Sequence, residues 1–502
     1  MSTPCPRRPG TPMAHGLRPA RRRLLGLASA LIATLMRPGT AAAADAPGST
    51  PAAPAGLPEP LRRALQAQGL PPQALHLWVQ DADSGRTLRA WQAEQALNPA
   101  SLFKLVTAWA ALDRLGPQFR WRTPVWLDGP LREGVLQGAL VIQGRGDPRW
   151  TPERLWLLVS RLRQSGLQRI AGDLVLDRQA FTVEATDPGA FDGEPLRPYN
   201  VAPDALLLAQ RSVVYTFTPD VGAGLARVTV QPRLADHGVQ PTVPLTDGPC
   251  GDWRGGLRAT PQDTRQMRFD GRYPSACGER AWPLAWPEAA SFDARLWRAL
   301  WAEAGGQLDG RVRDGTAPDR APSFVLESPP LAEVLRDIQK WSNNTLAQQL
   351  FLTLGLEQGG RGDAPTARRV LQDWLAERLG TAEAARIVVD NGSGLSRQTR
   401  ISAAQLGRLL QQGWQSPLMP EWLAALPLAG IDGTAARSQG ATGRAHLKTG
   451  SLADVAGVAG IVHGLDGRRR VLVAVIRHEQ AGRFRAVLDA AQDWVVQYPG
   501  SP

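Results

Sequence analysis

The sequence predicts an α+β protein in which an antiparallel sheet flanked by helices is interrupted by a large inserted, mainly β region. Three observations lead to this fold class. Two strand patterns stand near the start of the chain, three more stand near its end before a closing helix, and the residues between 113 and 282 change to a Pro-rich texture of strands and turns. Strands joined by hairpins and followed by a helix are typical of an antiparallel sheet with helices packed on it.

The elements before the insertion are a helix, a hairpin and a second helix. Asp83-Ser84-Gly85 is turn sequence, and it joins the two strands of the hairpin. Apolar residues then recur at helical spacing until Gly116-Pro117 stops the pattern. In chain order we expect a helix over 57–69, strands over 74–81 and 87–91, and a helix beginning at Ser101.

The inserted region and the remainder of the chain follow the same two periodicities. Within the insertion, strands over 138–143 and 172–177 flank a helix over 152–164. A turn at Gly464-Leu465-Asp466-Gly467 joins the last two strands. The elements expected after the insertion are helices over 292–304, 331–339 and 344–356, strands over 444–448, 455–462 and 470–477, and a helix over 482–496.

The chain of 502 residues is too long for one hydrophobic core, so more than one domain is expected. We assign residues 45–112 and 283–502 to one catalytic domain. Residues 113–282 are the inserted region, with two subdomains.

The net charge of +11 is concentrated at the N-terminus, where residues 1–44 hold seven arginines and no acid. Without them the charge is +4, and no basic stripe alternates with aromatic residues, so nucleic-acid binding is not indicated. Residues 1–44 instead read as a signal peptide cleaved near Ala44, because Arg21-Arg22-Arg23 precede a short apolar run and then four alanines. That run is too short to span a bilayer, and no later segment is apolar enough to span one. A periplasmic protein is expected, exported by the general or the twin-arginine route.

Two cysteines, Cys250 and Cys277, remain once Cys5 leaves with the signal peptide. An even pair in an exported protein indicates a disulfide, the alternative being two unrelated thiols. The six histidines show no ligand-like spacing with one another or with cysteine, so no metal is expected, and no cofactor is implied.

Lysine is rare in this chain, with three residues among 57 basic ones, and each lies near a serine. Ser101 and Lys104 share one face of a helix, where a neutral amine is able to act as the base for a serine nucleophile. The position in the first helical turn and partial burial both lower the pKa of the lysine. The alternative is an ordinary first-turn serine beside a solvated lysine.

Two further motifs follow in the chain. Ser342-Asn343-Asn344 begins a helix two residues after Lys340, and it offers a proton-relaying hydroxyl and a substrate-binding amide, or else a simple helix N-cap. Lys448-Thr449-Gly450-Ser451 ends a strand, where its hydroxyls and charge suit a carboxylate, although such a triplet is also a common turn. The backbone N–H groups of Ser451 and Ser101 would form an oxyanion hole.

These motifs are, in order, the Ser-x-x-Lys, Ser-x-Asn and Lys-Thr-Gly set of penicillin-recognising serine enzymes. The whole chain after the leader resembles the low-molecular-mass class C penicillin-binding proteins, that is, peptidase family S13 or the penicillin-binding protein 4 type of D-alanyl-D-alanine carboxypeptidase. The long gap between Ser101 and Ser342 and the run Gly392-Ser393-Gly394-Leu395-Ser396-Arg397 carry the same resemblance. Asn343 stands where an Asp is more usual, and Ser451 where a Thr is frequent.

The resemblance implies a β-lactamase/transpeptidase-like fold and a role for each motif residue. Ser101 would be the acylated nucleophile and Lys104 its base. Ser342 would relay a proton, and the substrate-binding residues would be Asn344, Lys448, Thr449, Ser451 and Lys340. Substrate-reading acids on the inserted domain are a further family trait, for which Asp192 and Glu194 are candidates.

The implied activity is a serine D-alanyl-D-alanine carboxypeptidase and DD-endopeptidase acting on peptidoglycan stem peptides and cross-links. β-Lactams would act as covalent inhibitors through the same serine. The alternatives are a β-lactamase of the same superfold and a catalytically silent wall-binding protein. The balance of the two activities, the third stem-peptide residue and the oligomeric state are left open by the sequence.

Overall fold

The computed structural model describes residues 56–263 and 266–498. The predicted signal peptide over 1–44, with its cleavage site near Ala44, lies outside the described residues. Within those residues, no helix is long and apolar enough to cross a membrane.

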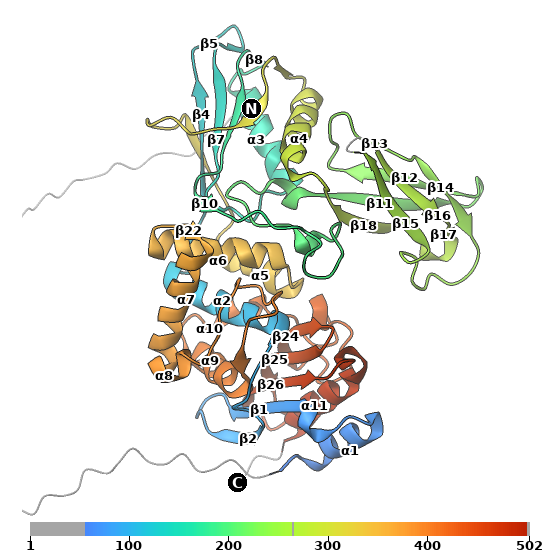
Figure 1. Cartoon of the computed structure of the whole chain (residues 1–502), viewed down its shortest axis with the longest axis vertical. Coiled ribbons are helices and arrows are strands. Elements are labelled where there is room, and N and C mark those ends of the chain that lie inside the picture. Colours follow the sequence, from blue (N-terminus) through green and yellow to red (C-terminus); the bar gives the residue numbers. More distant parts are fainter. Residues whose placement is uncertain (1–55, 264–265, 499–502) are drawn as a thin grey trace, which may run out of the picture. The chain divides into compact units, whose positions relative to one another are not determined.

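A five-stranded antiparallel sheet joins the two ends of the described chain, in the order β2-β1-β26-β25-β24 (Figure 1). Its strands are β1 (Leu75–Asp81), β2 (Thr87–Trp91), β24 (Ala445–Leu452), β25 (Val455–His463) and β26 (Arg469–Arg477). Strand β1 pairs along its whole length with β26, from Leu75 opposite Ile476 to Asp81 opposite Arg470. The five strands expected from the sequence are confirmed. β24 extends to Leu452 instead of residue 448, because its pairing with β25 continues that far, and the ends of the other four strands agree with the prediction within one residue.

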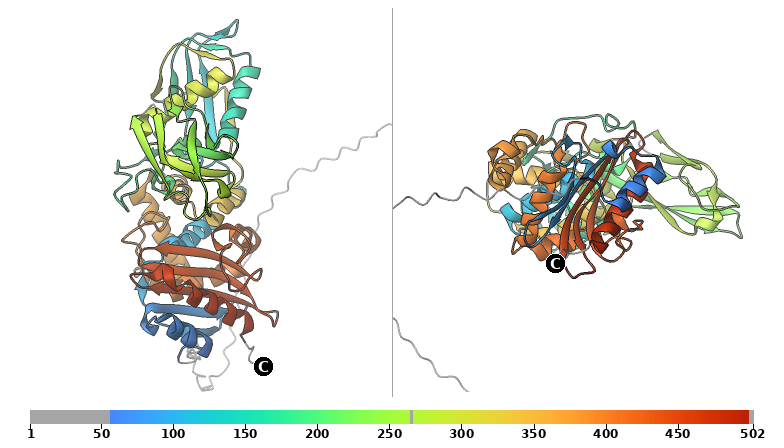
Figure 2. Two further views of the ribbon diagram at one scale, coloured as in Figure 1. Left: turned by 90° about the vertical axis from the view of Figure 1, so that its right-hand side faces the viewer. Right: turned by 90° about the horizontal axis from the view of Figure 1, so that it is seen from below.

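Helices cover both faces of this sheet (Figure 2). The strand side chains alternate between two cores. In β26, Leu472 and Ala474 pack with the terminal helices α1 (Glu59–Gln68) and α11 (Arg485–Gln497). The alternate residues of the same strand, Val471 and Val473, belong to the core on the other face. This alternation with period two fixes which face of β24 borders the site.

The second face is covered by helices from the beginning, middle and end of the chain. They are α2 (Phe103–Leu115), α5 (Leu331–Lys340), α6 (Asn344–Gly359), α7 (Ala364–Leu379), α8 (Thr381–Ala384), α9 (Ala403–Gln415) and α10 (Met419–Ala425). Helix α2 is buried from Phe103 to Leu112, so it is the central helix of this layer. The sequence predicted α2, α5 and α6, but no helix was predicted for α7, α9 or α10.

The intervening region is built mainly of strands around one core of its own. One sheet has the order β20-β9-β7-β4-β21 and another the order β17-β14-β12-β11-β18. The strands of the first are β4 (Arg122–Asp128), β7 (Ala139–Gln143), β9 (Leu174–Asp177), β20 (Val312–Asp314) and β21 (Phe324–Glu327). Those of the second are β11 (Ser212–Asp220), β12 (Leu225–Gln231), β14 (Thr242–Thr246), β17 (Tyr273–Pro274) and β18 (Arg280–Ala285).

Smaller sheets and two helices complete this region. The sheets have the orders β19-β8-β6-β5 and β13-β16-β15. Their strands are β5 (Leu131–Arg132), β6 (Val135–Leu136), β8 (Arg169–Ile170), β13 (Gly238–Val239), β15 (Leu257–Asp263), β16 (Gln266–Gly271) and β19 (Gln307–Leu308). The helices α3 (Pro152–Gln164) and α4 (Ala289–Glu303) supply Leu155 and Phe292, among others, to the same core.

The strand pairing bears on where the insertion ends. Strand β21 pairs with β4, β20 pairs with β9, and α4 packs in the core of the inserted region. Residues 289–327, which the predicted boundary at 282 assigned to the catalytic domain, therefore share sheets and a core with residues from 122 onward. We propose that the insertion extends to about residue 327.

The predicted disulfide is confirmed, since Cys250 and Cys277 are bonded. It links the segment after β14 to the turn before β18, and Cys277 is buried in the core of the inserted region.

Replacing both cysteines by serine should lower the free energy of unfolding by about 3 kcal/mol, because the bond closes a loop of 27 residues in the unfolded chain. Denaturant unfolding followed by tryptophan fluorescence measures the difference. Reductant should destabilise the wild type by a similar amount and leave the double variant unchanged. Equal stability of the two proteins without reductant would contradict the prediction.

Candidate active site

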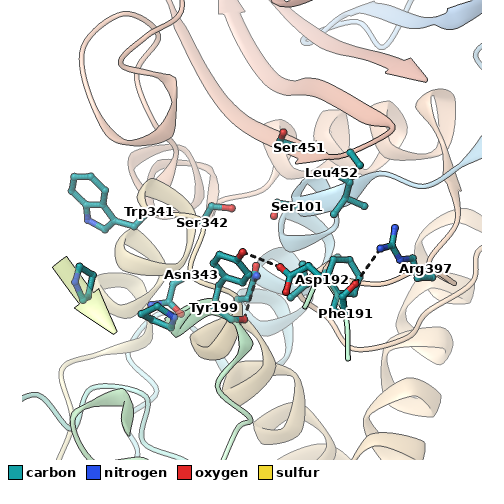
Figure 3. A pocket seen from close by; sticks show the side chains of 16 residues that line it. Ser101, Phe191, Asp192, Tyr199, Trp341, Ser342, Asn343, Arg397, Ser451 and Leu452 are labelled. Atoms are coloured by element: carbon teal, nitrogen blue, oxygen red, sulfur yellow. Dashed lines mark hydrogen bonds between the residues drawn. The ribbon is translucent and has the colours of Figure 1, made fainter. Parts of the chain in front are cut away.

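Three segments distant in the sequence meet at one edge of the central sheet. Ser101 lies on the 3-10 turn Ala100–Leu102 that leads into α2, Ser342 lies between α5 and α6, and Ser451 lies on the edge strand β24. All three side chains border the same two cavities, the first of which is drawn in Figure 3. The structure thus brings together the three motifs that the sequence singled out.

Lys104 is fully buried and makes three polar contacts. Its Nζ lies 2.9 Å from Ser101 Oγ, 2.6 Å from Asn344 Oδ1 and 2.7 Å from the Ser393 carbonyl oxygen. None of these partners is a carboxylate, so nothing in this shell compensates a positive charge. Burial, and then the nearby Lys448 ammonium, lower the pKa of Lys104 well below its ordinary value.

The hydrogen-bond partners of Lys104 fix how a neutral amine would be oriented. The Ser393 carbonyl and Asn344 Oδ1 accept hydrogen bonds and cannot donate them. Because a neutral amine has two hydrogens, these acceptors use both and leave the nitrogen lone pair for the Ser101 hydroxyl. Lys104 in this state is able to accept the proton of Ser101.

The turn that carries Ser101 is held between the loop at Gly394 and the edge strand β24. Ala100 has a left-handed backbone (φ 49°), and its N–H donates to Asn98 Oδ1 at 2.9 Å. Gly394 packs so closely that a Cβ there would lie 1.9 Å from the Ala100 carbonyl oxygen. On the sheet side, a Cβ at Gly450 would lie 2.9 Å from the Pro99 carbonyl oxygen. Both glycines are therefore required for the backbone to approach the serine this closely.

Ser342 and Lys448 form a second serine–lysine contact. Lys448 Nζ donates to Ser342 Oγ at 2.9 Å and to the Thr449 carbonyl at 2.6 Å. Lys448 is fully buried, and burial lowers the pKa of its ammonium to about 7. Ser342 has a left-handed backbone (φ 56°), which is unfavourable for a residue with a Cβ and is held here by the turn between two helices. Within the protein, Lys448 contacts the Ser342 hydroxyl and the Thr449 carbonyl, and its role as the partner of a substrate carboxylate stays a prediction.

The two asparagines of the Ser-x-Asn motif have different positions. Asn343 is the N-cap of α6, where its Oδ1 accepts from the Leu346 N–H at 3.0 Å. Asn344 is buried and faces Lys104 through Oδ1, while its Nδ2 points toward the Tyr199 carbonyl. The capping alternative thus applies to Asn343 and not to Asn344.

Thr449 and Ser451 present hydroxyls to the cavities from β24. Thr449 Oγ1 donates to Thr434 Oγ1 at 2.7 Å, and both threonines border the second cavity. Ser451 is exposed and borders both cavities. The Ser451 hydroxyl is an accessible donor for an anionic group, and the Thr449 hydroxyl becomes one when Thr434 donates in the reverse direction.

Lys340 lies outside the lining of both cavities. Its ammonium forms an ion pair with Asp432, whose other oxygen accepts from the Leu428 N–H at 2.8 Å. Although burial alone would raise the pKa of Asp432, the hydrogen bond from Lys340 and that from Leu428 lower it. Through Asp432, Lys340 contacts the loop that carries Thr434. No contact within the described residues places it in either cavity, so its role as a substrate-binding residue stays a prediction.

The two cavities lie on either side of Ser101 and have volumes of about 550 and 490 Å³. The first contains Asn344, Trp341 and side chains of the inserted region, and the second contains Thr449 and side chains of α11. A substrate that extends in both directions from the serine therefore has room on each side.

Of the two acids considered on the inserted region, Asp192 lines the first cavity and Glu194 does not. Asp192 accepts hydrogen bonds from the Tyr199 hydroxyl and from Asn200, both at 2.9 Å, and these outweigh burial and lower its pKa. Arg397 borders the same cavity, lies over the Phe191 ring at 4.5 Å from its centroid, and donates to the Phe191 carbonyl (Figure 3). One wall thus holds a carboxylate and a guanidinium.

Sequence reasoning missed several residues that support the lysine. Ser393 contacts it through a backbone carbonyl, which no residue-type pattern reveals, and Gln339 donates to the Lys104 carbonyl at 2.8 Å. Asn98 donates to the Ser396 carbonyl at 2.7 Å while accepting from Ala100. The only available signal was the run Gly392–Arg397, which the sequence analysis connected with the family as a whole and not with Lys104.

Fold and site together define the class. In this site a buried lysine contacts a serine at the start of a helix, beside the edge strand of an antiparallel sheet that has helices on both faces. This is the arrangement of penicillin-binding, transpeptidase-like serine enzymes. The chain belongs to the D-Ala-D-Ala carboxypeptidase 3 (S13) family, whose family model matches residues 57–496. It is accordingly a serine-type D-Ala-D-Ala carboxypeptidase, as the resemblance implied.

Individual relatives agree with this assignment. A D-alanyl-D-alanine carboxypeptidase from Actinomadura sp. (strain R39) is 28% identical over 84% of this chain and 81% of that protein. The D-alanyl-D-alanine carboxypeptidase DacB of Haemophilus influenzae is 23% identical over 76% and 81%. The crystal structure of penicillin binding protein 4 from H. influenzae matches the fold with a TM-score of 0.69 at 22% identity, covering 86% of this chain and 97% of that one.

The two buried lysines predict a bell-shaped pH dependence of kcat/KM for a peptide ending in D-Ala-D-Ala. The rate should rise with pH as Lys104 becomes neutral, and fall above about pH 7 as Lys448 loses the charge that we predict to attract the substrate carboxylate. In Lys448→Arg the falling limb should disappear, because a guanidinium keeps its proton. Lys340→Arg, the same change outside the cavities, should keep both limbs. A falling limb that persists in Lys448→Arg would contradict this assignment.

Asn344→Asp places a carboxylate beside the Lys104 amine and should hold it in the charged form. We expect kcat/KM at pH 7 to fall about tenfold or more, with the rising limb displaced to higher pH, since a pKa increase of one or more units is usual for such a neighbour. Asn343→Asp is the matched control, because Asp caps a helix as well as Asn and residue 343 does not touch Lys104. Similar pH profiles for the two variants would show that Asn344 does not set the protonation of the lysine.

Proposed function

We propose that Ser101 is the nucleophile of a serine D-alanyl-D-alanine carboxypeptidase that acts on peptidoglycan stem peptides, with Lys104 as its general base. One observation carries the proposal. The only contact of Lys104 in which its lone pair is usable is the one with the Ser101 hydroxyl, because its two other partners are obligate acceptors.

In acylation, a bond forms between Ser101 Oγ and the carbonyl carbon of the penultimate D-alanine, and the C–N bond to the last D-alanine breaks. Lys104 accepts the hydroxyl proton. Ser342, 2.9 Å from Lys448, is the group we assign to pass this proton on: it gives its hydroxyl proton to the departing nitrogen and takes the one that Lys104 accepted, so that Lys104 is neutral again for the attack of water. Water then hydrolyses the ester, which releases the shortened peptide and restores the Ser101 hydroxyl.

The remaining motif residues bind and orient the substrate in this proposal. Thr449 and Ser451 donate to the terminal carboxylate, and Lys448 supplies a positive charge behind them. Asn344 contacts a backbone amide of the acyl side, and the N–H groups of Ser101 and Ser451 receive the oxyanion. Lys340 acts indirectly, by fixing through Asp432 the loop that carries Thr434.

Cross-link cleavage and acylation by β-lactams extend the same chemistry. A cross-link presents the same D-alanyl carbonyl with a larger amine as leaving group, and a β-lactam presents a strained amide to the same serine. The penicillin binding protein 4 of H. influenzae, which shares this fold, has been crystallised in complex with a β-lactam. We propose that this chain, exported by the signal over residues 1–44, carries out these reactions in the periplasm.

Intact-mass analysis after penicillin treatment should show one covalent adduct on the wild type and none on Ser101→Ala or Lys104→Arg, because the first lacks the nucleophile and the second cannot accept its proton. In parallel, stem pentapeptides and cross-linked muropeptides should both be cleaved by the wild type. An unmodified mass together with uncleaved peptides would refute the proposal and favour a silent wall-binding protein. Rapid release of hydrolysed penicillin would instead favour a β-lactamase.

A further inference from the structure

The second cavity lies on the leaving-group side of Ser101, provided that the proposed function is correct. Thr449, which we assign to the carboxylate of the departing residue, borders this cavity and not the first. Asn344, which we assign to the acyl side, borders the first cavity and not the second. The space beyond the scissile bond is therefore the chamber between β24, the loop 433–438 and α11.

This chamber is larger and more positive than a single departing D-alanine requires. Its volume is about 490 Å³, and two of its lining residues are arginines, Arg437 and Arg485. Both are exposed, and neither has an ion pair within the described part of the chain. Two unpaired guanidiniums in one chamber attract carboxylates.

The acid of the chamber does not neutralise this charge by pairing with the arginines. Asp489 Oδ1 accepts from the Ser438 hydroxyl at 2.7 Å and from the Gln439 N–H at 3.2 Å. These bonds hold the loop against α11 and direct the carboxylate toward the loop backbone. The guanidiniums remain available to a ligand.

The loop that carries Arg437 is fixed in place. The Ala441 N–H donates to Asp493 Oδ1 at 2.8 Å, and a Cβ at Gly440 would lie 2.3 Å from the Asp489 carbonyl oxygen. The loop is therefore packed tightly on the helix that carries Arg485. A cation held on a rigid element loses less conformational freedom when it binds an anion than a flexible one does.

We infer that this chamber receives the leaving strand of a cross-linked peptide, an amine-bearing peptide with free carboxylates, and that Arg437 and Arg485 bind those carboxylates. The inference rests on the proposed function and specifies its substrate: cross-links are bound through contacts that a terminal D-alanine does not reach. When the C–N bond breaks, the amine nitrogen takes the proton relayed from Ser101, and the carboxylates leave with the strand. The arginines thus lower KM for cross-links and have no part in the chemical step.

The test compares the wild type with Arg437→Gln/Arg485→Gln on three substrates: a stem pentapeptide ending in D-Ala-D-Ala, a cross-linked muropeptide dimer, and the same dimer with the carboxylates of its leaving strand amidated. For the dimer, kcat/KM should fall about tenfold in the double variant, mainly through KM, as expected for the loss of two exposed ion pairs. Pentapeptide hydrolysis and the rate of acylation by penicillin should stay within about twofold. The amidated dimer should be cleaved equally by both proteins, because without its carboxylates it cannot form ion pairs with the two arginines of the wild type.

Arg444→Gln is the control for loss of surface charge, since Arg444 is exposed and borders neither cavity. It should leave all three substrates unaffected. Equal losses on pentapeptide and dimer would overturn the inference, because they would place the arginines on the terminal carboxylate itself. Unchanged dimer cleavage in the double variant, or no dimer cleavage by a wild type that hydrolyses the pentapeptide, would also overturn it while the carboxypeptidase function stands. Failure of the wild type on every substrate and on penicillin would instead refute the proposed function.

Discussion

The burial of the Lys104 amine between two carbonyl oxygens is the constraint on which the rest of the site depends. A buried ammonium without a carboxylate costs several kcal/mol, and the shell of Lys104 contains only neutral oxygens. The neutral amine is therefore the stable form, and it is the form that activates a serine. This state requires three elements to converge: α2 supplies the lysine, the start of α6 supplies Asn344, and the loop at Ser393 supplies a carbonyl. Displacing any one of them would admit water and return the lysine to its charged state.

The chain achieves this convergence by closing the sheet around the insertion. Pairing of β1 with β26 joins residues 75–81 to residues 470–476, so α2 leaves the sheet at a fixed position beside β24. Where these segments meet, glycines allow the backbones to come into direct contact: Gly394 packs against Ala100, and Gly450 packs against Pro99. The left-handed backbones of Ala100 and Ser342 are unfavourable locally and are imposed by the surrounding packing. Stability elsewhere in the fold thus maintains strained geometry at the site.

Much of the fold was predictable from the sequence, because periodicity reports burial directly. The strands of the central sheet alternate between two cores, and α2 has the apolar spacing of a buried helix. Helices α7 and α9 were missed. The pairing of β21 with β4, on which we base the proposed end of the insertion near residue 327, was not predictable, because pairing between strands distant in sequence leaves no local pattern. At the site, the motifs identified Ser101, Lys104 and Asn344, whose side chains do meet. The Ser393 carbonyl was not predictable, because every residue has one.

The two sides of the serine carry binding groups with different consequences for turnover. Contacts on the acyl side, such as those available in the cavity of Asp192 and Arg397, persist after the C–N bond breaks and stabilise the acyl-enzyme as well as the substrate. The contacts that we infer on the leaving side, at Arg437 and Arg485, would be lost when the strand departs. Binding energy on the leaving side therefore favours capture of a cross-link without slowing hydrolysis of the ester. For the cross-link cleavage that we propose, the guanidiniums of Arg437 and Arg485 would therefore strengthen substrate binding without holding back the product.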